Sequence, residues 1–263
     1  LGSTVRKLSD GDYTVRTANS SRDEIGTLAD RVNQLAESLE KNRTARQRWI
    51  ADVAHELRTP VAVLKGEIEA VADGVREVDE RMLASLTEEI NHLAGLVSDL
   101  QALALADAGA LNIIKQPTDL SALAEQAADT YRHRLGEREI RFELEAGEGL
   151  EAVVDPQRIR QLLHNMLENS NRYVDSGGRV RLKLEEAGGI RLLLEDSGPG
   201  VSDEQLDHLF DRFYRAEGSR SRATGGTGLG LSICKNIVEA HGGRIEAGHS
   251  KLGGLALRVD LPA

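Results

Sequence analysis

One short segment, residues 55–60 (HELRTP), combines side chains that could carry out nucleophilic and acid–base chemistry. A neutral imidazole such as that of His55 is a competent nucleophile near neutral pH. Glu56 follows it directly and could accept its proton, and Thr59 lies four residues on, which places it on the same helix face. Pro60 removes a backbone hydrogen bond and should bend a helix here. A lone helical histidine is usually a solvated surface residue, so this cluster favours a functional histidine without deciding the matter.

A second polar group follows helical spacing within residues 161–173. Asn165, Asn169 and Arg172 fall on one face of the expected helix. The opposite face carries apolar side chains, namely Leu162, Leu163, Met166 and Leu167. Amide oxygens can ligate Mg2+, and a guanidinium can hold a phosphate group. The alternative is an ordinary solvated face, and the spacing alone favours neither.

Two glycine-rich turns form the third candidate site. Residues 196–200 (DSGPG) end an expected strand, and residues 224–231 (TGGTGLGL) open an expected helix. Glycine lets a ligand approach the backbone closely, and the N–H groups of a helix N-terminus bind anions. Asp196 could accept a hydrogen bond from an exocyclic amine. Because the turns flank a basic, polar segment at 215–222, they indicate a nucleotide pocket with a lid, although the spacing matches neither a P-loop nor a dinucleotide fold.

Two long amphipathic segments must position the histidine. Residues 24–74 contain one proline, and their apolar residues follow the 3,4 spacing of a coiled-coil seam, beginning with Ile25, Leu28, Val32, Leu35 and Leu39. Such a helix of about 50 residues would be roughly 75 Å long. A second stripe runs from Leu83 to Leu103. Two hairpins of this kind make a four-helix bundle, so we expect a homodimer; the alternative is a hairpin packed on its own chain.

Beyond residue 109 the pattern changes to short strands and helices. Helices are expected at 120–135, capped by Asp119, and at 156–173, 203–213 and 229–241. Strands are expected at 140–145, 179–185, 190–195, 244–247 and 255–261, with a hairpin turn at Gly188-Gly189. This part of the chain is therefore predicted to be an α/β layer domain with a largely antiparallel sheet and helices on one face.

Composition excludes several classes of protein. The chain has 263 residues, 33 Lys and Arg against 43 Asp and Glu, and 40% hydrophobic residues, which is enough for packed cores. The net charge of −10 and only 3% aromatic residues argue against nucleic acid as a partner. The single cysteine, Cys234, indicates a reducing compartment and is expected to be a packed core residue. No window approaches 18 consecutive apolar residues, and the missing initial Met suggests a piece of a longer protein.

Together these segments resemble the motifs of the sensor histidine kinases of two-component systems, over essentially the whole chain. HELRTP resembles the phosphoacceptor box, residues 165–173 (NMLENSNRY) the N box, and residues 210–215 (FDRFYR) the phenylalanine box. DSGPG and residues 225–231 (GGTGLGL) resemble the glycine boxes. The five motifs occur in the family's order and spacing, and the residues around them are similar to those of BaeS-type envelope-stress kinases. GDYTVRT and DEIG near the start resemble the second part of a HAMP linker.

The resemblance implies a multidomain α and α+β protein, in which a coiled-coil/four-helix dimerisation bundle precedes a Bergerat-type (GHKL) α/β sandwich. The expected domains are a partial HAMP linker at 1–42, a dimerisation and histidine phosphotransfer hairpin at 43–110, and a catalytic ATP-binding domain at 111–263. The segment at 105–116 would be the hinge. The implied location is the cytoplasmic side of the bacterial inner membrane, with membrane segments preceding residue 1.

The implied activity is autophosphorylation of His55 from Mg-ATP, transfer of the phosphoryl group to an aspartate of a response regulator, and dephosphorylation of that regulator. Glu56 would activate His55, and Thr59 would help position water for the dephosphorylation of the regulator. Asn169 would ligate Mg2+, with Asn165 lining the phosphates. The other implied nucleotide-binding residues are Arg172, where the family often has Lys, Tyr173, Asp196, Gly198, Gly200, Arg215, Gly226, Thr227, Gly228, Leu229 and Gly230.

Two alternative functions would use the same nucleotide pocket. One is an ATPase of the chaperone or topoisomerase kind, against which the HELRTP helix argues. The other is a nucleotide-sensing scaffold, against which the intact Asn169, Asp196 and glycines argue.

Overall fold

The computed structural model describes residues 2–18, 24–107, 112–147, 149–216 and 227–262. The chain divides into two compact units, Leu1–Leu86 and Thr87–Ala263. Each unit is described by itself.

The first unit is helical. Helix α1 (Gly2–Ser9) is followed by a connector, described over residues 10–18, and by the long helix α2 (Glu24–Ala72), and α3 (Glu80–Asp107) begins in this unit. The connector is fixed to α2: the side chain of Asn33 pairs with both backbone groups of Thr17, at 2.8 and 2.9 Å, and Arg16 forms an ion pair with Glu40 at 2.7 Å. The predicted helix from residue 24 to about 74 is confirmed.

Helix α2 continues through Pro60 without interruption. In the N-terminal part of α2, one side of the helix is covered, and the small residues Ala29 and Ala36 on that side are buried. The apolar residues Ile25, Leu28 and Leu35 of the predicted seam remain 62%, 52% and 55% exposed in the single chain. No helix in the described ranges is both long enough and apolar enough to cross a membrane.

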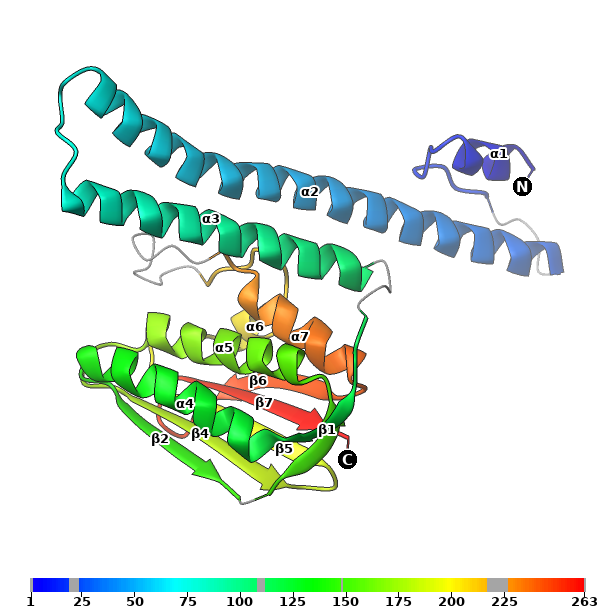
Figure 1. Cartoon of the computed structure of the whole chain (residues 1–263). Coiled ribbons are helices and arrows are strands. Elements are labelled where there is room, and N and C mark those ends of the chain that lie inside the picture. The colour runs from blue at the N-terminus through cyan, green and yellow to red at the C-terminus, as the bar shows by residue number, and fades with distance from the viewer. Residues whose placement is uncertain (1, 19–23, 108–111, 148, 217–226, 263) are drawn as a thin grey trace. The chain divides into compact units, whose positions relative to one another are not determined.

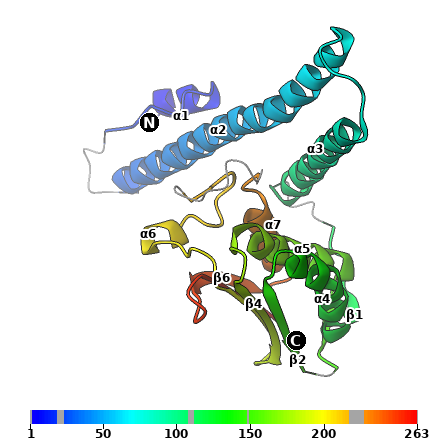
Figure 2. The same cartoon turned by 90° about the vertical axis from the view of Figure 1, so that its left-hand side faces the viewer.

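The second unit is built around a mixed sheet. Its five strands lie in the order β2 (Arg141–Ala146), β4 (Arg179–Glu186), β5 (Ile190–Asp196), β7 (Leu255–Leu261) and β6 (Arg244–His249). The β2–β4 pair is parallel and the other pairs are antiparallel. Three helices, α4 (Leu120–Glu137), α5 (Pro156–Tyr173) and α7 (Gly230–Ala240), cover one face of the sheet (Figures 1 and 2). The predicted layer domain is therefore confirmed.

The core of this unit follows from strand alternation and helix amphipathicity. Every second residue of β4, including Val180 and Leu182, is buried, and β7 alternates in the same way. The buried side of α5 is the predicted apolar face of Leu162, Leu163, Met166 and Leu167. Packing this helix face on the sheet leaves the polar face of α5 on the outside of the core, where it can meet a ligand.

Local signals explain where the elements begin and end. The side chain of Asp119 accepts the N–H of Ala122 and caps α4, as predicted, and Asp155 caps α5 by accepting the N–H groups of Gln157 and Arg158. The hairpin at Gly188-Gly189 is confirmed, with positive φ at both glycines. The expected helix at 203–213 is wrong beyond α6 (Asp203–Leu206), because the chain continues in turns and Phe213 has a φ of +59°.

Two strands are additional to those that the sequence predicts. Strands β1 (Gln116–Asp119) and β3 (Glu151–Val154) form a separate antiparallel pair. Both have only four residues, and Pro117 within β1 argues against a strand from sequence alone.

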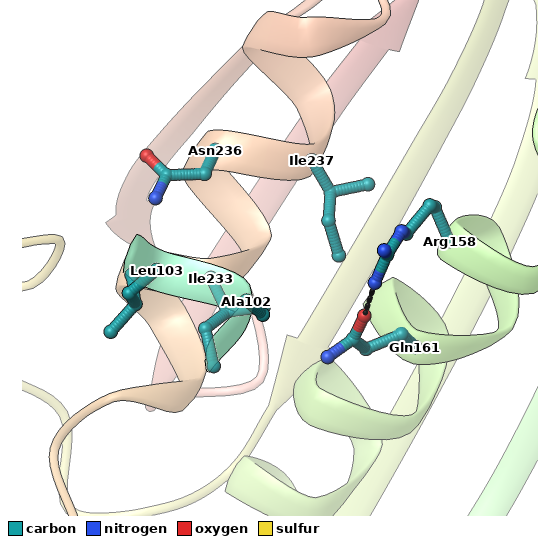
Figure 3. Close-up of a pocket in the computed structure, with 7 residues that line it drawn as sticks. All are labelled: Ala102, Leu103, Arg158, Gln161, Ile233, Asn236 and Ile237. Atoms are coloured by element: carbon teal, nitrogen blue, oxygen red, sulfur yellow. Dashed lines mark hydrogen bonds between the residues drawn. The ribbon is translucent and has the colours of Figure 1, made fainter. Parts of the chain in front are cut away.

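Within the second unit, the C-terminal part of α3 lies beside α5 and α7. Figure 3 shows Ala102 and Leu103 of α3 around a small pocket with Ile233 and Ile237 of α7. Arg158 and Gln161 of α5 and Asn236 of α7 complete its lining. None of these residues belongs to the predicted site, so this pocket is separate from the expected chemistry.

Candidate nucleotide and phosphoacceptor sites

The predicted phosphoacceptor cluster lies on α2, in the first unit. His55 and Thr59 are exposed, and Glu56 is half-buried. The Thr59 hydroxyl donates a long hydrogen bond of 3.4 Å to the backbone carbonyl of His55, one helical turn earlier. The imidazole is therefore presented on a helix surface, with a carboxylate next in sequence and a hydroxyl on the same face.

The second unit holds a buried carboxylate, Asp196, at the end of β5. It is 4% exposed. Its Oδ1 accepts the backbone N–H groups of Gly198 and Leu255, both at 3.0 Å, and its Oδ2 accepts the Ser170 hydroxyl at 3.0 Å. A carboxylate has about four acceptor positions. Three are occupied, so Asp196 keeps capacity for one further donor, and this fits the exocyclic amine of an adenine.

Glu195 is the neighbouring residue and is also buried. Burial alone would raise the pKa of Glu195, but hydrogen bonds from the Arg181 guanidinium and the Lys251 N–H outweigh it and lower the pKa. The negative charge of Glu195 is thus compensated by protein groups, which leaves Asp196 as the carboxylate with spare acceptor capacity.

Glycines allow three chain segments to meet around Asp196. A Cβ at Gly254 would lie 2.3 Å from Asp196 Oδ1, and a Cβ at Gly198 would lie 3.2 Å from the same oxygen. Gly200 has a φ of +67°, and its Cβ would lie 3.4 Å from the carbonyl of Gly253. The close neighbours of these glycines are the Asp196 carboxylate and backbone groups, so the glycines permit the carboxylate cradle to form.

Helix α5 carries the predicted phosphate-side residues. Asn165 donates from Nδ2 to the carbonyl of Gly230 at 3.3 Å, which ties α5 to the start of α7. No residue in the described part of the chain forms a hydrogen bond with the side chain of Asn169, whose amide is free to bind a ligand. Arg172 lies 3.7 Å from Glu168, and Tyr173 ends the helix beside Gly198.

The second glycine-rich turn leads into α7. Gly228 has a φ of +68°, its carbonyl accepts the N–H of Phe213 at 3.0 Å, and Leu229 forms the helix N-cap without a side-chain hydrogen bond. The uncapped N–H groups of this helix end can bind an anion. The Thr227 hydroxyl accepts the N–H of Leu229, and Arg215 is half-buried. Gly226 and most of the expected lid at 215–222, namely residues 217–222, lie outside the described residues.

The structure thus groups the predicted residues into two sets in different units. His55, Glu56 and Thr59 lie in the first unit, and the remaining described site residues lie in the second. Among the described residues, no cluster of three or more His, Cys, Asp or Glu side chains could hold a metal by itself. An Mg2+ bound through Asn169 would therefore need further oxygens from a ligand, and nucleotide phosphates supply such oxygens.

Sequence reasoning missed Ser170, Gly254 and the N–H of Leu255, which complete the Asp196 cradle. Ser170 directly follows Asn169 in the motif, so its small hydroxyl side chain was a usable signal. The Gly253-Gly254 turn lies more than 50 residues from Asp196 in the sequence, and no sequence signal linked that turn to Asp196. Cys234 is buried, which agrees with its predicted role in the core, and burial raises the pKa of its thiol.

Comparison with known proteins agrees with these observations. Residues 1–41 match the HAMP domain, residues 45–109 the His Kinase A (phospho-acceptor) domain, and residues 154–263 the histidine kinase-, DNA gyrase B- and HSP90-like ATPase family. The chain is 49% identical over 259 residues to the signal transduction histidine-protein kinase BaeS of Escherichia coli (strain K12). That match covers 98% of this chain and 56% of BaeS, so the chain spans little more than half of that relative's length.

Two solved structures have the same fold. The Acinetobacter baumannii histidine kinase AdeS is 29% identical, with a TM-score of 0.67 over 79% of this chain and 97% of that one. Full-length ShkA in complex with AMPPNP is 26% identical, with a TM-score of 0.59 over 82% of this chain and 45% of that one. The chain therefore belongs to the sensor histidine kinases of two-component systems, with HAMP, phosphoacceptor and ATPase regions in that order.

Proposed function

We propose that this chain transfers the γ-phosphoryl group of Mg-ATP to His55, passes it to an aspartate of a response regulator, and also dephosphorylates that regulator. The observation that carries the proposal is the Asp196 cradle, which retains one acceptor position, on a chain that also displays His55 on an exposed helix. The solved structure of full-length ShkA is a complex with AMPPNP, which supports a nucleotide as the ligand of this chain.

The nucleotide-side residues have distinct tasks. Asp196 accepts the adenine amine, and the cradle glycines Gly198 and Gly200 allow the base to approach. Asn169 supplies an amide oxygen to Mg2+, while Asn165, Arg172 and the segment from Thr227 to Gly230, which leads into α7, bind phosphate oxygens. Tyr173 and Arg215 complete the binding residues. Mg-ATP supplies the phosphoryl group when bound, together with the metal charge that offsets phosphate repulsion.

The phosphoacceptor side needs only a nucleophile and a proton acceptor. His55 attacks through a neutral ring nitrogen, and Glu56 accepts the proton from the other ring nitrogen. In the dephosphorylation of the regulator, Thr59 orients the water that attacks the aspartyl phosphate and releases inorganic phosphate. A hydroxyl whose present hydrogen bond is as long as 3.4 Å can exchange it for a water molecule. Since His55 and Asp196 lie in different units, the two sites must approach each other during catalysis. The units divide within α3, between Leu86 and Thr87, so the hinge expected at 105–116 stays a prediction.

We further infer that the working form is a homodimer anchored to the cytoplasmic side of the bacterial inner membrane. The exposed seam of Ile25, Leu28 and Leu35 supports a second copy as its cover, because such a stripe is stabilised by a partner helix. The HAMP match supports the membrane association. The proposed domain limits are 1–42, 43–110 and 111–263.

The test is phosphorylation with γ-labelled ATP and Mg2+. Wild-type protein should acquire acid-labile, base-stable label, and the His55→Gln variant should acquire none. His133→Gln is the matched control, because His133 is also an exposed helical histidine, with a side chain 83% exposed. Label that persists in His55→Gln would refute the assignment. ATP hydrolysis without protein label would favour the chaperone-type ATPase, and binding without hydrolysis would favour the scaffold.

A further inference from the structure

A polar network joins α4 to α5 beside the proposed phosphate site. Its centre is the carboxylate of Glu168 on α5. Oε2 of Glu168 accepts the Tyr131 hydroxyl at 3.0 Å and lies 3.3 Å from Nη1 of Arg134, both on α4. Oε1 of Glu168 lies 3.7 Å from Nη2 of Arg172. One carboxylate thus connects a buried tyrosine and two arginines.

The Tyr131 end of this network is rigid. Tyr131 is 1% exposed, and its hydroxyl also lies 2.9 Å from His164 Nδ1. Burial and the charge of Glu168 raise the pKa of Tyr131, so the phenol stays protonated and can donate. The His164 carbonyl is a further acceptor, 3.3 Å from the same hydroxyl. A carboxylate is the stronger acceptor, so the hydroxyl donates to Glu168. The position of Glu168 is therefore set from α4, outside the proposed nucleotide site.

The network ends at Arg172, on the other oxygen of the Glu168 carboxylate. Arg172 lies one helical turn beyond Glu168 and three residues beyond Asn169, and its side chain is only 25% exposed. A guanidinium has five N–H donors in a fixed fork, so it can face Glu168 with one nitrogen and a phosphate with the others. The single ammonium of a lysine could not hold both partners in a fixed orientation. This gives a physical reason for Arg at position 172.

We propose that Glu168, held by Tyr131, is a positioning residue that orients Arg172 toward the nucleotide phosphates. This inference rests on the proposed ATP site and adds a second layer to it. Glu168 and Tyr131 contact neither the base nor, in this assignment, the phosphates. They act through Arg172, so their removal should weaken the binding of a triphosphate and leave the binding of adenosine unchanged.

The decisive variant is Tyr131→Phe, because it removes the hydroxyl without changing any charge. Glu168→Gln is less informative, since it also removes a negative charge that repels phosphate, and the two effects oppose each other. Equilibrium titration with Mg-ATP and, separately, with adenosine should give about 3- to 10-fold weaker ATP binding for Tyr131→Phe and unchanged adenosine binding. That range is the one expected for losing the hydrogen bond to Glu168, the bond through which Tyr131 acts on Arg172. Tyr13→Phe is the matched control, because Tyr13 lies in the first unit and also has an arginine over its ring.

A double-mutant cycle separates positioning from a general loss of stability. In an Arg172→Ala background, Tyr131→Phe should cause no further loss of ATP affinity. An equal loss in that background, or an equal loss of adenosine binding, would overturn the inference while leaving the ATP site intact. If wild-type protein bound neither ATP nor adenosine, the proposed function itself would fail and the positioning role with it.

Discussion

The substitution Gly254→Ala should disrupt the adenine-binding cradle without replacing any residue proposed to contact ATP. A Cβ at this position would lie 2.3 Å from Asp196 Oδ1 and 2.4 Å from the N–H nitrogen of Gly198. Both atoms belong to the hydrogen-bonded turn after β5, so neither can move away as a flexible side chain would. The carboxylate must shift, and its bonds from Gly198 and Leu255 must lengthen or break.

The magnitude follows from these contacts. Inserting a methyl group into a packed site costs about 1–3 kcal/mol, and each hydrogen bond to a charged group contributes about 1.5–3 kcal/mol. Because the loop can relax in part, we expect the free energy of unfolding to fall by about 2–4 kcal/mol. A displacement of Asp196 worth about 2 kcal/mol would weaken adenine binding roughly 30-fold.

The assay combines urea denaturation with equilibrium titration of adenosine and Mg-ATP. Gly248→Ala is the matched control, because Gly248 lies in β6 without a positive φ, and a Cβ added there would meet nothing within 4 Å. Gly248→Ala should change neither the free energy of unfolding nor the free energy of ligand binding by more than about 0.5 kcal/mol. Wild-type stability and affinity in Gly254→Ala would show that the cradle does not depend on this close approach, and the reasoning would be refuted.

Three further substitutions test other parts of the second unit. Asp155→Ala should lower the free energy of unfolding by about 1–2 kcal/mol at pH 7, since Asp155 accepts the N–H groups of Ile114, Gln157 and Arg158. Burial alone would raise the pKa of Asp155, but these bonds lower it relative to the unfolded chain, so the difference in urea midpoint should persist above about pH 4 and shrink as the pH falls further. Asp99→Asn should stabilise the unit at pH 7.5 by roughly 1 kcal/mol after allowance for solvent exposure, and not at pH 4.5. The reason is that burial raises the pKa of Asp99 to about 6, so the folded state loses stability as the pH rises through that value; an equal gain at both pH values would contradict this. Gly228→Ala should weaken Mg-ATP binding at least 10-fold, because its Cβ would lie 2.7 Å from the carbonyl carbon of Phe213, whereas Gly242→Ala, with a φ of +80° but open space, should affect only stability; equal ATP affinities in the two variants would argue against the predicted role of Gly228.

Sequence patterns predicted the elements that have strong periodicity or clear caps. Helix α5 begins after Asp155 and carries four apolar residues on one face, so both its limits and its buried side were predictable. The short strands β1 and β3 have too few residues to show alternation. The expected helix at 203–213 failed because its residues are helix-compatible, whereas Phe213 takes a positive φ to meet Gly228, a contact that only the tertiary fold imposes.

The residues of the candidate site also divide into those that the sequence could predict and those that it could not. Asp196 and the N-box residues were predictable because their types match the chemistry of amine, metal and phosphate binding. The groups that hold Asp196, in particular Gly254 and the Leu255 N–H, were not, because they come from a distant turn and act through the backbone. The link from Tyr131 to Glu168 crosses between two helices and has no spacing that a sequence reveals.

The three hydrogen bonds to Asp196 also affect how inactive variants should be designed. This carboxylate joins α5, the turn after β5 and the first residue of β7, so Asp196→Asn would loosen the empty protein as well as remove an adenine contact. A loss of phosphorylation in that variant could not be assigned to nucleotide binding alone. Asn169 forms no such links within the described chain, so a substitution there removes a ligand while leaving the scaffold's hydrogen bonds in place. For cellular experiments that need an abundant but silent protein, position 169 is the better choice.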